Sequence, residues 1–352
     1  MRQLRIAVIA GDGIGPEVVE AAIEIADQAV SPAGVRLEWT RFPWNSNYYF
    51  EHGRMMPPNA IEQLRPFDAI FLGAIGHPKI QDHITLNGLL LPIRRRFDQY
   101  VCVRPAYLFD GVESPLKNYP PGQIDILVFR ENTEGEYANV GGRLYEGFEQ
   151  EVAVQTAVHT RRGCRRIIQA AFRAARKRRH KVTSVTKSNA QGYGMVLWDD
   201  VFREVAVEFP DVQTNSLLID AAAMEFVRRP DRFDVVVASN LFGDILTDLG
   251  AAIVGSMGLA PSGNINPERT SPSMFEPVHG SAPDIAGQGI ANPIAAVLSA
   301  AMMLDHLDVS SAARSIEAAV KGVLGSRNPR TPDLGGTAKT SDVTRALLNH
   351  IP

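Results

Sequence analysis

Strand-like and helix-like segments alternate along this chain, and that alternation restricts the possible folds more than any other feature. Short apolar runs rich in β-branched residues are typical of buried strands, and apolar residues recur at helical spacing in the segments between them. The predicted strands are residues 5–10, 68–74, 124–129, 181–186, 212–219 and 234–238. The predicted helices begin at residue 16 and lie near 164–178, 192–208, 222–228, 241–254, 292–306, 312–324 and 341–349. The pattern indicates an α/β protein with helices packed on a largely parallel sheet.

Three segments depart from this alternation. Residues 139–160 alternate like a hairpin and predict an exposed β-arm. Residues 256–272 and 276–293 are rich in glycine and proline and predict long ordered loops. Loops of that length in a compact domain usually bind a ligand.

The composition is that of a globular chain without affinity for polyanions or membranes. With 352 residues, 45% of them hydrophobic and 21% charged, the chain can build roughly two domains with sizeable cores. The net charge of −3 gives no overall attraction to nucleic acid or to an anionic membrane. Two cysteines, Cys102 and Cys164, provide no disulfide framework, and no apolar stretch is long enough for a signal segment or a membrane span. We therefore expect a cytoplasmic protein.

The segment after the strand at 234–238 places two carboxylates on one helix face. Asp244 and Asp248 are four residues apart in a predicted helix that Asn240 can cap. Two close like charges repel unless a cation lies between them, and carboxylate oxygens suit Mg²⁺ or Mn²⁺. An isolated pair of this kind is more often a solvated helix face, so the metal hypothesis depends on the residues around it.

Arginines and a lysine lie at the ends of strand-like segments. Arg104 and Arg130 end such segments, and Arg94 lies on a short helical one. Although a lone arginine is usually a surface ion-pair residue, three guanidinium groups would suit a small dicarboxylic acid. Lys187, also at a strand end, could act as a base if it were desolvated near a metal, and Asp220 could supply a third metal carboxylate.

Two glycine-rich segments and one tyrosine complete the candidates. Residues 11–17 resemble a dinucleotide fingerprint but are one residue short, so they predict either cofactor contact or only a tight turn. Tyr137 is a candidate proton donor. In the loop after residue 276, His279 and Asp284 could contact an adenosine. Asp284 would accept hydrogen bonds from ribose hydroxyls and repel a 2′-phosphate, which predicts NAD rather than NADP.

Together these motifs strongly resemble the β-decarboxylating dehydrogenases, the family of isocitrate, 3-isopropylmalate, homoisocitrate and tartrate/D-malate dehydrogenases. The similarity covers essentially the whole chain and is most specific at residues 11–17, 128–137, 239–250 and 276–293. It implies that family's two-domain fold with a twisted mixed sheet, which is not a standard Rossmann fold. One domain would be built from residues 1–101 and 255–352 and would bind the cofactor. The other, residues 102–254, would be inserted and would carry substrate, metal and dimer contacts.

The resemblance also implies a role for each candidate. Lys187 and Tyr137 would be the acid–base pair, and Lys187 and Asp220 would reach the neighbouring subunit's site in a homodimer. The implied substrate contacts are Arg94, Arg104, Arg130, Asn87 and Leu90. The implied ligands of Mg²⁺ or Mn²⁺ are Asp220, Asp244 and Asp248. The implied NAD contacts are His279, Gly280, Ser281, Ala282, Asp284, Ile285 and Asn292. A monovalent cation such as K⁺ is also compatible with the resemblance.

The residues before Arg94 indicate which branch the chain resembles. Isocitrate enzymes carry a serine and an asparagine where this chain has Gly88 and Leu90, and isopropylmalate enzymes carry an acid where it has Asn87. Residues 44–49, 52–57, 97–100 and 111–117 look most like the tartrate/D-malate branch, which often has a tryptophan at the position of Asn87. D-malate or tartrate is therefore the implied substrate, with 3-isopropylmalate, homoisocitrate and isocitrate as alternatives.

A different class of function rests on residues 161–181, which contain ten lysines and arginines on an amphipathic pattern. Such a helix could track phosphates in a nucleic-acid-binding or regulatory protein built on a dehydrogenase scaffold. The balanced charge of the chain favours a solvated helix face instead. The sequence thus predicts an NAD- and metal-dependent oxidative decarboxylase of a (2R)-malate-type 2-hydroxy acid.

Overall fold

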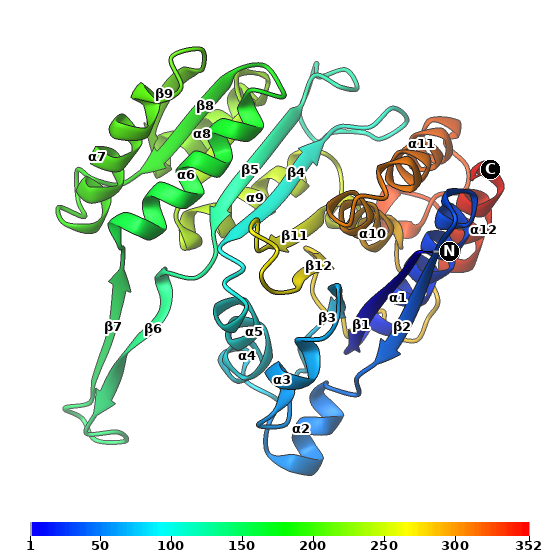
Figure 1. The fold of residues 1–352 in the computed structure, drawn as a ribbon, viewed down its shortest axis with the longest axis horizontal. Helices are drawn as coiled ribbons and strands as arrows, with labels where there is room; N and C mark the ends of the chain where they lie inside the picture. The colour runs from blue at the N-terminus through cyan, green and yellow to red at the C-terminus, as the bar shows by residue number, and fades with distance from the viewer. Residues whose placement is uncertain (1, 352) are drawn as a thin grey trace. The chain divides into compact units, whose positions relative to one another are not determined.

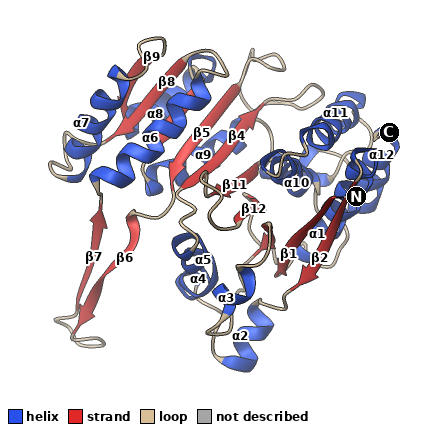
Figure 2. Ribbon diagram, viewed as in Figure 1, coloured by secondary structure: helices blue, strands red, loops and turns tan. Residues whose placement is uncertain are grey.

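The computed structural model describes residues 2–351, which divide into two compact units. Unit 1 consists of three segments: the described residues up to Gln99, Arg104–Ile124, and the described residues from Gly250 onward. Unit 2 consists of Tyr100–Val103 and Asp125–Leu249. Ten of the twelve strands in this range belong to a mixed sheet, and β6 and β7 form a separate two-stranded sheet. The predicted α/β class with a mixed sheet is confirmed (Figures 1 and 2).

Unit 1 is built around five strands in the order β2-β1-β3-β12-β11, parallel except for the antiparallel pair β11 and β12. The strands are β1 (Arg2–Gly11), β2 (Val35–Arg41), β3 (Ala69–Ala74), β11 (Pro261–Ile265) and β12 (Ser273–Pro277). The helices are α1 (Gly15–Val30), α2 (Ser46–His52), α3 (Ala60–Leu64), α4 (Asp82–Thr85), the π-helical turn Leu86–Leu90, α5 (Leu91–Arg96), α10 (Ile294–His306), α11 (Ser310–Ser326) and α12 (Thr340–His350). Strand β4 (Val101–Tyr107) begins in unit 2 and ends in unit 1.

The central strands of unit 1 are buried on both faces because their side chains alternate between two cores. Ile6 and Val8 pack with apolar residues of α1, α10, α11 and α12, whereas Ala7 and Ile9 pack with those of α3 and α5. This burial explains why the strands appear in the sequence as nearly continuous apolar runs.

His306, at the end of α10, packs its ring 5.6 Å from that of Phe275, and burial, followed by Arg269, lowers its pKa to about 4. The unfolded chain takes up a proton near pH 6.5 and the folded chain does not, so the folded state loses stability as the pH falls from 6.5 to about 4. We expect His306→Gln to remove about 2 kcal/mol of this loss. Urea unfolding of the wild type and of His306→Gln at pH 7.5 and 4.5 measures the loss of stability in each protein. An equal loss in both proteins would contradict the prediction.

Unit 2 contains four parallel strands in the order β5-β10-β8-β9. They are β5 (Asp125–Glu131), β8 (Lys181–Thr186), β9 (Gln213–Leu218) and β10 (Val235–Ala238). The helices are α6 (Arg161–Ala175), α7 (Gly194–Val207), α8 (Ile219–Arg228) and α9 (Asn240–Ile253). Each strand except β5 is followed along the chain by one of these helices, as the alternating sequence pattern predicts.

A two-stranded arm extends from the rest of unit 2 (Figure 1). Its antiparallel strands are β6 (Gly135–Leu144) and β7 (Val152–Val158), so a hairpin lies where the sequence predicts one. The arm exposes large apolar side chains, namely Val140, Leu144, Tyr145, Phe148, Val152 and Val154. Apolar residues of this kind on a thin hairpin suggest a surface that another chain covers.

The structure differs from the sequence expectations in two places. Residues 256–272 are not a continuous loop, because β11 lies within them and is held by pairing with β12 rather than by any β-branched run. Residues 104–124 group with unit 1 and not with the inserted part of the chain. Phe109 is buried in the core of unit 1, which accounts for that grouping.

Among residues 2–351, no helix combines the length and apolar character needed to cross a membrane. Both cysteines are buried free thiols. Burial, followed by nearby Glu134, raises the pKa of Cys164 to about 12, so this thiol is unreactive at neutral pH.

Candidate active site

The carboxyl ends of the four parallel strands bring the predicted polar residues of unit 2 to one edge. Arg130 lies near the end of β5, Lys187 follows β8, Asp220 begins the helix after β9, and Asn240 begins the helix after β10. Parallel strands end on the same side of a sheet, which is where α/β proteins bind their ligands.

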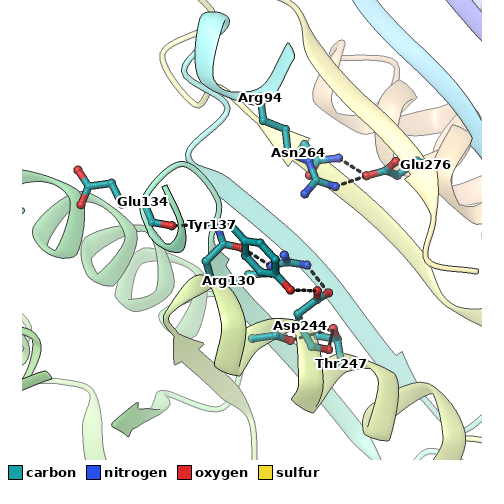
Figure 3. Close-up of polar contacts among 10 residues, drawn as sticks. Arg94, Arg130, Glu134, Tyr137, Asp244, Thr247, Asn264 and Glu276 are labelled. Atoms are coloured by element: carbon teal, nitrogen blue, oxygen red, sulfur yellow. Dashed lines mark hydrogen bonds and ion pairs between the residues drawn. The ribbon is translucent and has the colours of Figure 1, made fainter. Parts of the chain in front are cut away.

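Arg130 is the centre of a buried cluster in unit 2 (Figure 3). Its side chain is only 3% exposed, its Nε donates to Asn240 Oδ1 at 2.9 Å, and its guanidinium pairs with Asp244. A Cβ at Gly243 would lie 2.6 Å from Arg130 Cβ, so glycine is needed for α9 to approach β5. Asn240 therefore holds Arg130 instead of capping α9, which corrects the sequence expectation.

Tyr137 joins the same cluster from strand β6 (Figure 3). Its hydroxyl donates to Asp244 Oδ2 at 3.0 Å, and the Arg130 guanidinium carbon lies 5.4 Å from its ring centroid. Burial, followed by the Asp244 carboxylate, raises the pKa of Tyr137 above its usual value. The phenol consequently keeps its proton at neutral pH and can act as a general acid.

Asp244 and Asp248 provide a donor set that fits a hard divalent cation. The Asp244 side chain is 33% exposed, and Asp248, one turn further along α9, is exposed. Carboxylate oxygens at this spacing suit Mg²⁺ or Mn²⁺. Within residues 2–351, no three acidic, histidine or cysteine side chains gather closely enough to hold a metal ion.

Lys187 and Asp220 form a second pair in unit 2. Lys187 Nζ lies 2.6 Å from Asp220 Oδ1, and the two side chains are 27% and 66% exposed. The hydrogen bond from Lys187 is the main reason that the pKa of Asp220 is lowered. Both side chains are at least partly accessible at the edge of the strands.

In unit 1, Arg94 is held in place by a buried carboxylate. Its Nη2 lies 2.7 Å from Glu276 Oε1, which also accepts a hydrogen bond from Asn264 Nδ2 at 2.8 Å (Figure 3). Arg94 and Glu276 are 5% and 6% exposed, and Arg94 Nε has no partner among the described residues. A buried donor of this kind is available to a bound anion.

The other predicted substrate residues have different environments. Arg104 is buried and lies in the middle of β4 rather than at a strand end, because the strand continues to Tyr107, which corrects the sequence expectation. Asn87 is exposed on the π-helical turn, and its Nδ2 donates to the His83 carbonyl oxygen at 2.9 Å. Leu90 is 8% exposed and packs in the core beside β1 and β3.

The glycine turn of unit 1 supports the predicted cofactor loop. The Ile14 N–H donates to the Ser281 carbonyl oxygen at 2.9 Å, and a Cβ at Gly13 would lie 1.9 Å from that oxygen. Gly13 also has φ +56°, which favours glycine. The turn therefore has a structural function that accounts for its glycines without cofactor contact.

Two residues of the cofactor loop suit a nucleotide. His279 Nε2 is buried and has no partner within residues 2–351, and burial lowers the pKa of His279 so that the ring is neutral. Asp284 is exposed, which leaves its carboxylate accessible to ribose hydroxyls. An orphaned buried nitrogen and an accessible carboxylate on one loop fit an adenosine.

The remaining loop residues are ordered by local contacts. Asn292 Oδ1 accepts from the Ile294 N–H at 3.1 Å at the start of α10, and its Nδ2 donates to Asp333 at 3.0 Å. Ala282 adopts a positive φ of 41°, and Gly280 has open space where a Cβ would be. Ile285 is partly buried against the core of unit 1.

At least five of the ten basic residues in segment 161–181 form ion pairs in the structure. Arg161, Arg165 and Arg176 pair with Glu204, Glu208 and Asp211 at the surface. Arg178 and Arg179 pair with Asp125 and Asp234. These ion pairs offset the charge of five of the ten basic residues, which reduces the positive surface that a nucleic-acid-binding helix would need.

The family model for isocitrate/isopropylmalate dehydrogenase matches residues 5–347. The chain belongs to this family. Within the family it is 49% identical over its full length to a probable tartrate dehydrogenase/decarboxylase of Agrobacterium vitis, covering 98% of that protein. It is 50% identical to the D-malate dehydrogenase (decarboxylating) of Escherichia coli, covering 100% of this chain and 99% of that one.

A solved structure agrees with this assignment. The family fold is seen in the isocitrate dehydrogenase of Methylococcus capsulatus, whose TM-score to this structure is 0.90 at 36% identity, over 100% of this chain and 99% of the other. The recognised resemblance to this family, and to its tartrate/D-malate branch, is confirmed.

Sequence reasoning missed the partners that hold the arginines. Glu276 and Asn264, which fix Arg94, lie on strands that the sequence did not predict as a pair, and Asn240 was assigned only a capping role. One signal was available for Glu276, because an acid between Phe275 and Pro277 in a buried apolar segment needs a buried partner.

Proposed function

We propose that this member of the family oxidises and decarboxylates a (2R)-malate-type 2-hydroxy acid, D-malate or tartrate, with NAD and Mg²⁺ or Mn²⁺. The cluster of Arg130, Tyr137 and Asp244 carries the proposal. It combines an anion-binding guanidinium, a protonated phenol and a metal-binding carboxylate, which are the three functions such a reaction requires. Relatives named for tartrate and for D-malate match the chain over its whole length.

The arginines bind the substrate in this proposal. Arg94, Arg104 and Arg130 would bind its carboxylates, and their burial means that the charge–charge contacts form in a low-dielectric environment. The ion pair with Glu276 and the hydrogen bond with Asn240 fix two of these guanidinium groups before substrate arrives. Asn87 and Leu90 would line the substrate's C3 side, where the choice between D-malate, tartrate and 3-isopropylmalate is made.

The acid–base groups are Lys187 and Tyr137. Lys187 would accept the proton of the C2 hydroxyl as C2 is oxidised. After the resulting β-keto acid loses CO₂, Tyr137 would donate a proton to C3, which gives pyruvate from D-malate. The raised pKa of Tyr137 keeps its proton available for that step.

Asp244 and Asp248 fit the metal, and His279, Asp284 and the loop around them fit NAD. When bound, the metal supplies Lewis-acid polarisation of the substrate's C2 oxygen, and NAD supplies a hydride acceptor. The exposed Asp284 carboxylate would hold the ribose hydroxyls and disfavour a 2′-phosphate.

A homodimer with shared sites completes the proposal. Asp220 would provide the third metal carboxylate to the neighbouring subunit, together with Lys187 as its base. Exposed apolar residues on α8, α9 and the arm support an interface there, with Met224 49%, Ile245 50% and Phe148 67% exposed in the single chain.

A substrate panel tests the reaction directly. Purified protein is given Mn²⁺ and either NAD or NADP with D-malate, the tartrates, 3-isopropylmalate, isocitrate or homoisocitrate, while the reduced cofactor and CO₂ are followed. We expect D-malate or a tartrate with NAD to give the highest kcat/KM. Faster turnover with 3-isopropylmalate or with NADP would overturn the substrate or the cofactor assignment respectively.

Tyr137→Phe should separate the two chemical steps. We expect decarboxylation of oxaloacetate, the keto acid of malate, to slow by about 10²–10³-fold, because no acid remains to protonate C3. Reduction of oxaloacetate by NADH needs no proton at C3 and should fall much less. Tyr145→Phe, on the exposed arm, is the matched control and should leave both rates unchanged. An equal loss of both reactions in Tyr137→Phe would refute the role of the phenol.

A further inference from the structure

A cavity of about 290 Å³ lies at the end of unit 1 opposite to Glu276 and Arg94. Strands β1, β3 and β12 are parallel and begin at this edge, with Ala69 in register with Ser273. Glu276, by contrast, is near the carboxyl end of β12. The cavity is therefore separate from the residues to which the proposed reaction is assigned.

Three arginines from three segments line this cavity: Arg2 at the start of β1, Arg65 at the end of α3, and Arg269 before β12. Arg269 forms two hydrogen bonds with Asp308, at 2.6 and 3.0 Å. Arg2 donates to the Leu307 carbonyl oxygen at 2.9 Å. Over residues 2–351, neither Arg2 nor Arg65 forms an ion pair with a carboxylate, although Arg65 lies 5.7 Å from the ring centroid of Phe97.

The acids of the cavity are already engaged. Asp308 is paired with Arg269, and Asp68 Oδ2 accepts a hydrogen bond from the Arg5 N–H at 2.6 Å. His306 adds no charge near neutral pH, because burial beside Arg269 lowers its pKa to about 4. The three arginines and two aspartates thus leave a net charge of +1 in the cavity, beside the hydroxyls of Thr270 and Ser271.

We propose that this cavity binds a small anion that carries one or two phosphate groups. Guanidinium forks match phosphate oxygens bidentately, and the hydroxyls can donate further hydrogen bonds. The volume is at the lower limit of small-molecule sites, which suits phosphate, pyrophosphate or the phosphate end of a mononucleotide. The buried Leu4, Pro272 and Leu307 give the cavity an apolar floor that does not compete for the anion.

Calorimetric titration of the full-length, metal-free protein at constant ionic strength tests the proposal, with inorganic phosphate, pyrophosphate and AMP as separate ligands. We expect at least one of them to bind with a Kd below about 1 mM. The tightest of the three distinguishes a free phosphate from a nucleotide. No detectable binding of any of them at 10-fold higher concentration would overturn the proposal.

Three variants locate the bound anion. Arg65→Ala should weaken binding at least about fivefold, because it removes a guanidinium without a carboxylate partner. Asp68→Asn should tighten binding, since it removes a negative charge while its amide oxygen can still accept from the Arg5 N–H. Arg36→Ala, an exposed arginine on β2 outside the cavity, is the control and should leave the Kd unchanged.

The opposite signs of the two effects exclude a general loss of structure as their cause. Equal affinities in the wild type and Arg65→Ala would place the anion elsewhere, for example on the arginines proposed for the substrate, and would refute the site. Unchanged or weaker binding of the anion by Asp68→Asn would also refute the proposed site.

Discussion

Asp248→Asn should abolish metal-dependent turnover while leaving the fold intact. Asp248 is an exposed residue of α9, one turn after Asp244, on the helix that carries the proposed metal ligands. Asparagine has nearly the same shape but lacks the charge that a hard divalent ion requires. We expect kcat to fall by about 10²–10³-fold and Mn²⁺ binding to weaken in parallel. Activity assays across a Mn²⁺ titration and calorimetry measure these two changes.

The stability of the Asp248→Asn variant provides the control for this substitution. An exposed helical residue should change the free energy of unfolding by less than about 0.5 kcal/mol, so thermal unfolding of the metal-free variant should match the wild type. Asp200→Asn, a partly exposed aspartate on α7, should retain full activity. If Asp248→Asn turned over substrate normally without added metal, the metal-dependent mechanism would be excluded.

Mixing two inactive variants should restore activity if the sites are shared between subunits. In the proposal, Lys187 serves the partner's site and Tyr137 serves its own. A hybrid dimer of Lys187→Met and Tyr137→Phe subunits then has one site with both defects and one site with neither. Random pairing makes half of the dimers hybrids, so mixtures should recover about a quarter of wild-type activity.

The alternative arrangement gives a different result. If Lys187 and Tyr137 served the same chain's site, every site in the hybrid would carry one defect and no activity would return. Each variant should lose at least about 10²-fold in kcat when measured alone. Subunit exchange by mild unfolding and refolding of the mixture, with wild-type protein treated in parallel, provides the measurement and its control.

The contact between Lys187 and Asp220 within one chain bears on their proposed roles in the partner's site. Within one chain Lys187 donates a hydrogen bond to Asp220, and this contact lowers the pKa of the Asp220 carboxyl group. A catalytic base must lose that proton at least transiently. Engagement of Asp220 by a metal in the partner's site would remove its bond to Lys187, so the same assembly step would free both residues for their proposed roles.

Much of the fold followed from the sequence because strand and helix periods are local properties. The strands β1, β3, β5, β8 and β10 lie where apolar, β-branched runs predict them, and the arm lies where residues alternate. Strand β9 lies within the predicted 212–219, although its residues are mainly polar and exposed. The class of the protein and its family were also determined by local motifs, of which residues 239–250 are the clearest.

Only the tertiary structure determined which distant residues pair with one another. Strand β11 has no local signal and exists because β12 pairs with it, and residues 104–124 join unit 1 because Phe109 packs into its core. Arg130 and Asn240 are 110 positions apart, and Arg94 and Glu276 are 182 apart. The spacing of apolar residues shows which face of a helix or strand is buried, but not which other element covers that face. The partner of a buried charge is likewise set by distances between residues far apart in the sequence, and only the folded chain determines those distances.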